Sequence, residues 1–244
     1  MFKVVVIKEV TVIFFAFIFL LFSPAGCAVE KINNNSMVKN ESGSLGNISL
    51  PQPEVKGQVS LEEALYARIS RRNFGEKGLN LFEVSQLLWA AGGVGVDGLT
   101  GASRTAPSAG GIYPLELYLV VGEVEDMNKG VYYYDYKAHS LIMKQDKDVR
   151  GELARAALGQ QMVASAPAVI VMAAHIEKTT ARYGERGIRY VYLDAGYISQ
   201  NIYLQAEALN MATVAVGAFN DDTVKEIIQT EGAPVMIMPI GYAN

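Results

Sequence analysis

The sequence predicts an α+β domain that spans residues 59–244. Segments with the apolar spacing of amphipathic helices are interspersed with short runs rich in β-branched and aromatic residues. These segments do not follow the strict strand–helix–strand order that is typical of a parallel sheet. The chain has 244 residues, of which 50% are hydrophobic and 19% are charged, so it can bury a substantial core.

The first part of the chain differs in composition from the rest. Lys3 and Lys8 precede the uncharged apolar run 10–22, and small residues follow at 23–27. This order is typical of a secretory signal peptide, and the run is shorter than the roughly 20 residues of a membrane-spanning helix. A buried core helix is the alternative, but it would not carry this basic, apolar and small order. We therefore expect a signal peptide at 1–27 and export to the cell envelope.

Cys27, the only cysteine, stands where a bacterial lipoprotein signal places the residue that becomes lipidated. Pro24 departs from the aliphatic residue usual in such signals, so ordinary cleavage near Cys27 is the alternative. The segment 28–58 is rich in Asn, Ser, Gly and Pro, which is typical of a flexible tether. The domain is thus expected to be periplasmic, or held at the membrane only through an N-terminal lipid on Cys27.

Two capping boxes mark the starts of helices in the domain. Ser60 with Glu63, and Asn80 with Glu83, can each satisfy the first amides of a helix reciprocally. The apolar spacing after the first box predicts a helix that continues to about Phe74.

A long helix, a short helix and six strands complete the prediction. Residues 187–209 carry apolar side chains on most sides, which is typical of a helix that is central or lies at a subunit interface. A short helix is expected from Asp222. The strands are expected at 117–121, 131–136, 140–143, 167–172, 213–217 and 234–238.

Composition and spacing exclude several functions. A net charge of −4 argues against binding to a nucleic-acid backbone. One cysteine and two distant histidines, His139 and His175, provide no metal-ligand spacing. The segment 93–98 matches G-x-G-x-x-G, but a helix precedes it and a loop follows, so we expect no dinucleotide there. Asp194 and Glu207 lie more than about three turns apart on one predicted helix and form no acid–base pair.

Two polar motifs indicate a ligand. Arg71 and Arg72 could bind a phosphate through their planar forks of donors, although paired arginines are more often a solvated face. The segment 104–114 contains Arg104 and Tyr113 together with prolines, a serine and two glycines. Its backbone could lie against a flat ligand and donate to the ring edge, while the alternative is a long surface loop.

Further segments accompany RRNF at 71–74 and RTAPSAGGIYPLELY at 104–118. They lie, in order, at 130–135, 157–160, 183–190, 194–209, 216–221 and 239–242. Together these segments resemble the FMN-dependent nitroreductase family, and more closely its SagB-type dehydrogenase branch. Many separated motifs in the same order are a stronger signal than any one of them.

The resemblance implies an antiparallel sheet flanked by helices, in an intertwined homodimer with FMN at the interface. It assigns the phosphate and ribityl end of FMN to Arg71, Arg72 and Asn73. It places the flavin ring against the backbone of Pro107, Ser108, Ala109, Gly110 and Gly111. The remaining cofactor contacts would come from Gln160 and from a segment that covers the ring, Ala215, Val216, Gly217 and Ala218.

Two departures from the family pattern matter. Many relatives end with a further basic residue that binds the phosphate, whereas this sequence ends at Asn244. Azoline-oxidising members carry a Lys–Tyr pair as acid and base, and Arg182 and Tyr183 stand in its place. Arginine stays protonated and cannot act as a base, so Tyr183 is the expected proton-transfer group of this candidate catalytic pair.

The implied activity is hydride transfer between FMN and a small organic molecule. The expected donor is NAD(P)H, and the expected acceptor is a nitro or quinone-like compound. Dehydrogenation of a peptide-derived heterocycle is the second option in the same class. The alternative from another class is a non-catalytic flavin- or ligand-binding lipoprotein, because nicotinamide donors are scarce outside the cytoplasm.

Overall fold

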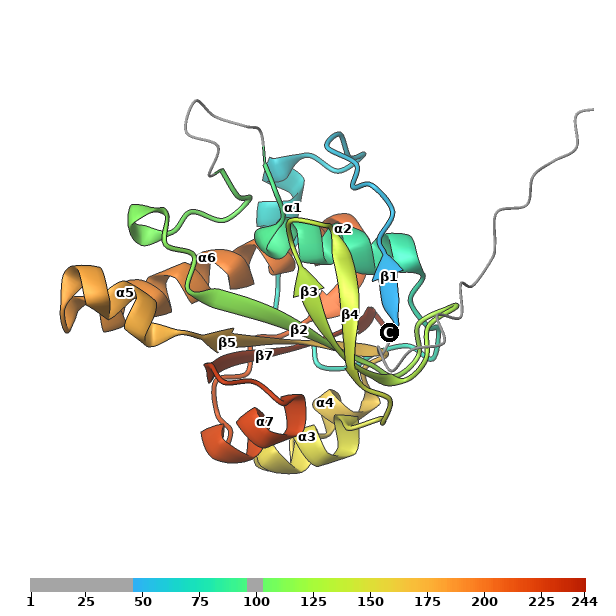
Figure 1. Ribbon diagram of the computed structural model, residues 1–244. Coiled ribbons are helices and arrows are strands. Elements are labelled where there is room, and N and C mark those ends of the chain that lie inside the picture. Colours follow the sequence, from blue (N-terminus) through green and yellow to red (C-terminus); the bar gives the residue numbers. More distant parts are fainter. Residues whose placement is uncertain (1–45, 96–102) are drawn as a thin grey trace, which may run out of the picture. The chain divides into compact units, whose positions relative to one another are not determined.

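The computed structural model describes residues 46–95 and 103–244 (Figure 1). The expected signal peptide 1–27, including Cys27, lies outside the described residues, as do most of the expected tether and positions 96–98 of the glycine motif. None of the helices in the described ranges is long and apolar enough to cross a membrane.

In the described part of the chain, a seven-stranded sheet forms the centre of the fold and confirms the predicted class. Each pair of neighbouring strands is antiparallel. In spatial order the strands are β1 (Asn47–Ser49), β4 (Ser140–Gln145), β3 (Gly130–Asp135), β2 (Leu115–Val121), β5 (Ala168–Ala174), β7 (Ala233–Tyr242) and β6 (Met211–Thr213).

Helices cover both faces of this sheet. They are α1 (Leu61–Ala67), α2 (Leu81–Gly92), α3 (Arg150–Ala156), α4 (Gln161–Ser165), α5 (Ile176–Tyr183), α6 (Arg186–Ala208) and α7 (Asp221–Ile228), with a short 3₁₀ turn at Ala109–Gly111. Figure 1 shows α1, α2 and α6 on one side of the sheet and α3, α4 and α7 on the other.

The interior strand β5 shows how the helices on both faces are held to the sheet. All seven of its residues are buried, as its continuous apolar run predicts. Ile170 and Met172 belong to the core under α2 and α6, whereas Val169 and Val171 belong to the core on the opposite face. Alternate side chains of one strand therefore fix both layers of helices to the sheet.

The two capping boxes are confirmed. Ser60 Oγ accepts from the Glu63 amide and Asn80 Oδ1 accepts from the Glu83 amide, and each glutamate carboxylate accepts from the amide of its cap residue. The long helix predicted at 187–209 is also confirmed, because α6 covers nearly the same residues.

The first helix is shorter than predicted. It ends at Ala67, because Arg68 adopts φ −56° and ψ 115°, outside the helical region. The chain then runs toward β6, where the Arg71 amide donates to the Thr213 carbonyl at 3.0 Å. The prediction that this helix continues to about Phe74 is therefore wrong, because α1 ends seven residues before Phe74.

The predicted strand 213–217 is also corrected. β6 ends at Thr213, and beyond it only Val216 forms an isolated bridge, with Ile237 of β7. The Ala215 amide donates to Tyr203 Oη at 2.8 Å and not to a neighbouring strand. A side chain of α6 thus replaces the strand partner at this position.

The described end of the expected tether is part of the folded domain. β1 pairs with β4, and Leu50 is only 6% exposed. The Gln86 side chain exchanges hydrogen bonds of 2.9 and 2.8 Å with the Glu54 backbone. The folded domain therefore begins before Val59. Hydrogen bonds to β4 and to Gln86 hold residues 46–54 in place, although their polar composition predicts a tether.

Candidate active site

The residues assigned to FMN by resemblance gather in two places in the structure. We call the first the arginine cluster, which contains Arg71, Arg72, Asn73, Gln160 and Ala215–Ala218. We call the second the loop cluster, which contains Pro107–Gly111, Arg182 and Tyr183.

The arginine cluster lies at the C-terminal end of α6. Arg71 forms a two-pronged ion pair with Glu207, with Nη1 and Nη2 at 2.5 and 3.1 Å from the two carboxylate oxygens. Arg72 and Asn73 are exposed. The cluster therefore combines one arginine that already has an anionic partner with exposed donors that face solvent.

Side chains from distant segments hold the arginine cluster together. Tyr203 Oη accepts from the Ala215 amide at 2.8 Å and lies 2.9 Å from Ser70 Oγ. Gln160 Nε2 donates to the Ala218 carbonyl at 3.2 Å. Tyr203 therefore joins the segment before Arg71 to Ala215, and Gln160 contacts the other end of the 215–218 segment.

The loop cluster is fixed to the middle of α6 by Asp194. Ser108 Oγ donates to Asp194 Oδ2 at 2.6 Å, and the Ala109 amide donates to Oδ1 at 3.4 Å. Asp194 is 3% exposed. Burial raises the pKa of the Asp194 carboxyl, and these two hydrogen bonds oppose that shift. A buried acid thus sets the position of the glycine-rich loop.

Gly110 brings Arg182 and Tyr183 onto this loop. It has φ +63°, and a Cβ added there would lie 2.5 Å from Tyr183 Oη and 2.8 Å from Arg182 Nη1. Arg182 Nη1 donates to the Gly110 carbonyl at 3.2 Å. The Tyr183 ring packs edge-on against Tyr190, with ring centroids 5.1 Å apart. Both candidate catalytic residues therefore contact the loop expected to lie against the flavin.

The two clusters lie far apart in one chain. Their contacts on α6, Asp194 and Glu207, are thirteen residues apart. At about 1.5 Å per residue, this separation is about 20 Å along the helix axis. The described residues of a single chain therefore do not bring the two clusters together.

Three residues that hold these clusters have no role in the sequence prediction. Sequence spacing excludes Asp194 and Glu207 as an acid–base pair and indicates no other role for them, and it indicates no site role for Tyr203. A buried acid within the apolar pattern of α6 is the signal that could have identified Asp194. Among the residues with described positions, no group of three His, Cys, Asp or Glu could hold a metal ion.

The sequence matches the nitroreductase family over residues 65–242. It is 42% identical to a protein of Methanocaldococcus jannaschii described as a nitroreductase, over 199 residues that cover 82% of this chain and 98% of the relative.

Solved structures show the same fold. A crystal structure from Ralstonia eutropha, also described as a nitroreductase, has a TM-score of 0.70 and 30% identity, covering 81% of this chain and 90% of that one. The NADPH:FMN oxidoreductase of Vibrio harveyi, solved with NAD⁺, has a TM-score of 0.54 and 18% identity, covering 75% and 69%. At this lower identity the similarity shows the fold alone.

Proposed function

Because the chain belongs to the nitroreductase family and is thus an oxidoreductase, we propose that it uses FMN to transfer hydride between a nicotinamide and a small organic acceptor. The observation that supports this most is the contact of Arg182 and Tyr183 with the glycine-rich loop at Gly110. Residues that are distant in the sequence meet where the family places the reacting ring.

The donors present suit the two ends of FMN. Arg71, Arg72 and Asn73 would bind the phosphate, because guanidinium forks match phosphate oxygens. The loop cluster would hold the ring, since Gly110 and Gly111 both have positive φ and leave backbone open to a flat ligand. When bound, FMN supplies a ring that can take up a hydride and return two electrons. Tyr183 Oη would hold the proton that accompanies reduction of the acceptor.

A second copy of the chain is needed to complete this site. The ribityl chain between the flavin ring and the phosphate spans at most about 10 Å, at about 1.5 Å per bond. This is much shorter than the 20 Å or so between the clusters of one chain. In a two-fold dimer with antiparallel α6 helices, the arginine cluster of one copy would lie beside the loop cluster of the other.

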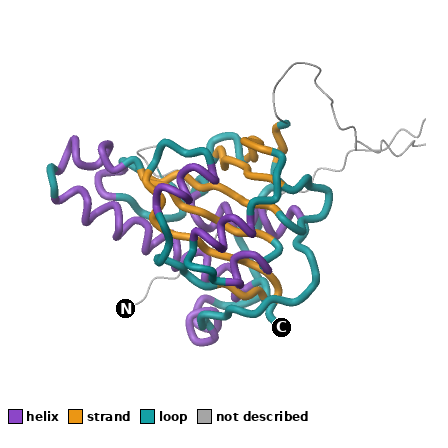
Figure 2. Tube along the Cα trace, turned by 90° about the horizontal axis from the view of Figure 1, so that it is seen from below, coloured by secondary structure: helices purple, strands orange, loops and turns teal. Residues whose placement is uncertain are grey.

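The exposed face of α6 is suited to that contact. Tyr192, Leu193 and Tyr197 are each at least 44% exposed, and no heavy atom lies within 4 Å of a Cβ built at Gly196. Figures 1 and 2 show α5 and the first half of α6 extending together beyond the sheet. A helix face with large apolar groups around a glycine allows a second helix to approach closely.

Sedimentation would test the dimer. The parent protein is expected to sediment as a dimer at micromolar concentration. Leu193→Glu should sediment as a monomer and bind FMN poorly. Leu158→Glu is the matched control, because Leu158 is 72% exposed and lies outside α6. A parent monomer that retains FMN would contradict the proposed dimer.

The enzymatic proposal has a direct test. The purified protein should be yellow with an FMN spectrum, and anaerobic mixing with NADH or NADPH should bleach it. Bleaching that a nitroaromatic or quinone then reverses would support the oxidoreductase. A yellow protein that neither nicotinamide bleaches would instead support the non-catalytic flavin binder, which family membership does not favour.

We further propose that the chain belongs to the SagB-type branch, on the segments RRNF and RTAPSAGGIYP. Within that branch Arg182 replaces the lysine of azoline-oxidising members, which argues against azole formation. Reduction of nitro or quinone-like acceptors is therefore preferred to oxidation of a peptide-derived heterocycle.

Export to the cell envelope is a separate proposal, supported by the basic, apolar and small order of residues 1–27. Mass spectrometry of the mature protein would test it. Acyl chains on Cys27 would support a lipid anchor, and a start at Ala28 or Val29 would support simple secretion. An intact N-terminus would contradict export.

A further inference from the structure

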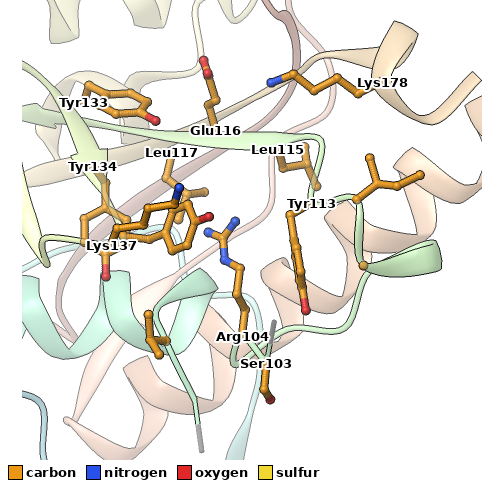
Figure 3. A pocket seen from close by; sticks show the side chains of 14 residues that line it. Ser103, Arg104, Tyr113, Leu115, Glu116, Leu117, Tyr133, Tyr134, Lys137 and Lys178 are labelled. Carbon is orange, nitrogen blue, oxygen red and sulfur yellow. The ribbon is translucent and has the colours of Figure 1, made fainter. Parts of the chain in front are cut away.

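A cavity of about 640 Å³ lies beside the loop cluster and, apart from Gly111, uses none of the proposed FMN contacts. Its volume is within the roughly 300–1,000 Å³ typical of small-molecule sites. Four tyrosines, three cationic side chains and one carboxylate line it: Tyr113, Tyr133, Tyr134, Tyr136, Arg104, Lys137, Lys178 and Glu116. Figure 3 shows the Arg104 guanidinium directed into the cavity, between Tyr113 and the segment that carries Lys137.

In the part of the chain that the structure describes, Arg104 enters this cavity without an acidic partner. Its Nε donates to the Gly92 carbonyl at 2.6 Å, and among the described residues its terminal nitrogens make no ion pair or hydrogen bond. The guanidinium carbon lies 3.8 Å from the Tyr136 ring centroid and 5.1 Å from that of Tyr113. Burial lowers the pKa of Arg104, and only tyrosines, with no carboxylate of the described residues, oppose that shift.

The remaining charges do not balance Arg104. Glu116, the only carboxylate among the described residues of the cavity wall, accepts from Tyr118 Oη at 2.9 Å through one oxygen. Its other oxygen lies 3.0 Å from His175 Nε2. Lys137 and Lys178 are exposed at the edge and add positive charge. The cavity therefore presents the terminal NH groups of the Arg104 guanidinium between aromatic rings, with two exposed lysines at its edge. Among the described residues these NH groups have no anionic partner.

We propose that this cavity binds the carboxylate end of a flat aromatic molecule, with Arg104 as the carboxylate-binding residue. The two terminal nitrogens of one guanidinium match the two oxygens of a carboxylate. The tyrosine rings would pack against the aromatic body. The terminal nitrogens of this half-buried guanidinium match two oxygens, whereas a phosphate presents three.

The cavity also adjoins the proposed reaction site. Gly111 belongs to both the cavity wall and the loop cluster. Lys178 stands one helical turn before Arg182 on α5, so a positive edge runs from the cavity to the loop cluster. The inference that the cavity binds the acceptor rests on the proposed function. The inference that it binds a carboxylate does not depend on that function.

Direct binding tests the site without turnover. Calorimetric titration of the purified FMN-loaded protein with benzoate should show binding, and benzamide, which has the same shape without the charge, should bind at least about tenfold more weakly. Arg104→Lys, which keeps the charge but not the fork, should weaken benzoate binding by about tenfold. Phenyl phosphate should bind no more tightly than benzoate.

Lysine variants keep the test valid if Arg104→Lys does not fold. Lys178→Gln should weaken benzoate binding severalfold, whereas Lys144→Gln, an exposed lysine of β4 outside the cavity, should leave it unchanged. Equal binding of benzoate and benzamide, tighter binding of phenyl phosphate, or unchanged benzoate binding in both Arg104→Lys and Lys178→Gln would overturn the proposal.

Turnover then separates the site from the function. With 4-nitrobenzoate and 4-nitrobenzamide as acceptors, Arg104→Lys should raise KM for the charged acceptor only. If neither acceptor is reduced but benzoate binding depends on Arg104, the carboxylate site stands and the proposed function fails. If both acceptors are reduced and Arg104→Lys affects them equally, the carboxylate site is wrong and the function stands.

Discussion

The arginine cluster and the loop cluster contact the same helix but offer a ligand different things. The arginine cluster offers charge, and Glu207 already compensates part of it. The loop cluster offers a fixed backbone conformation, which depends on the positive φ of Gly110 and on the hydrogen bonds to the buried Asp194. Changes in the first should therefore alter cofactor affinity, whereas changes in the second should alter turnover.

The largest effect is expected at the loop cluster, from Tyr183→Phe. This change removes only the hydroxyl, so the ring keeps its contact with Tyr190 and FMN should be retained. If Tyr183 Oη supplies the proton for acceptor reduction, turnover should fall by about 10²–10⁴-fold. The rate of reoxidation by the acceptor is the appropriate measurement, because reduction by the nicotinamide transfers a hydride and needs no proton from the tyrosine.

Tyr190→Phe is the matched control for that variant. It also removes one hydroxyl from the same ring pair, but no contact of this hydroxyl with Gly110 is seen among the described residues. Reoxidation should be nearly normal in this variant. Equal rates in the two variants and the parent would mean that Tyr183 only packs beside the loop.

A second loss of turnover is expected from Gly110→Ala. The left-handed backbone costs a residue with a Cβ about 1–2 kcal/mol, and the new Cβ would displace Tyr183 Oη and Arg182 Nη1. Misplacement of about 1 Å can reduce a rate by about 100-fold. Steady-state turnover, with FMN content measured in parallel, tests this expectation.

Gly159→Ala separates strain from displacement. Gly159 lies outside both clusters and has φ +76°, so it carries the same backbone cost, but no heavy atom lies within 4 Å of its added Cβ. Both variants should lose similar thermal stability, while only Gly110→Ala should lose most of its turnover. A similar loss of turnover in both would show that backbone strain, and not the position of Tyr183, is responsible.

In the arginine cluster, the expected loss is one of affinity. The Arg71→Ala, Arg72→Ala double variant should bind FMN about 10- to 100-fold more weakly, because a hydrogen bond to a charged group contributes roughly 1.5–3 kcal/mol. Titration of the apoprotein with FMN, followed by flavin fluorescence, measures this change. Arg155→Ala, an exposed arginine of α3, is the control, and unchanged affinity in the double variant would contradict the phosphate assignment.

Local signals in the sequence predicted most of the elements, although β1, α3, α4 and α5 have no counterpart in the prediction. The capping boxes at Ser60 and Asn80 and the apolar run of β5 each depend on neighbouring residues, and each was located well. The end of α1 and the strand predicted at 213–217 were wrong. Both depend on long-range partners, Thr213 for the chain after α1 and Tyr203 for Ala215.

The same distinction applies to the candidate site. The resemblance to the family identified the candidate site residues. The structure shows that two of them, Arg182 and Tyr183, contact the loop at Gly110. The partners that fix the clusters, Asp194 and Glu207, could not be identified from spacing. A buried acid and an ion pair are properties of tertiary packing and not of sequence separation.

The smallest expected effect concerns Glu207 and tests whether its ion pair opposes cofactor binding. The Arg71 and Glu207 side chains are 28% and 14% exposed, and a pair that solvent still reaches contributes at most about 1 kcal/mol. Glu207→Gln removes a carboxylate that competes with phosphate for Arg71 and also repels it. FMN affinity should therefore rise by up to about fivefold. A fall in affinity would mean that Glu207 holds Arg71 in its binding position, and the arginine cluster would then be as preorganised as the loop cluster.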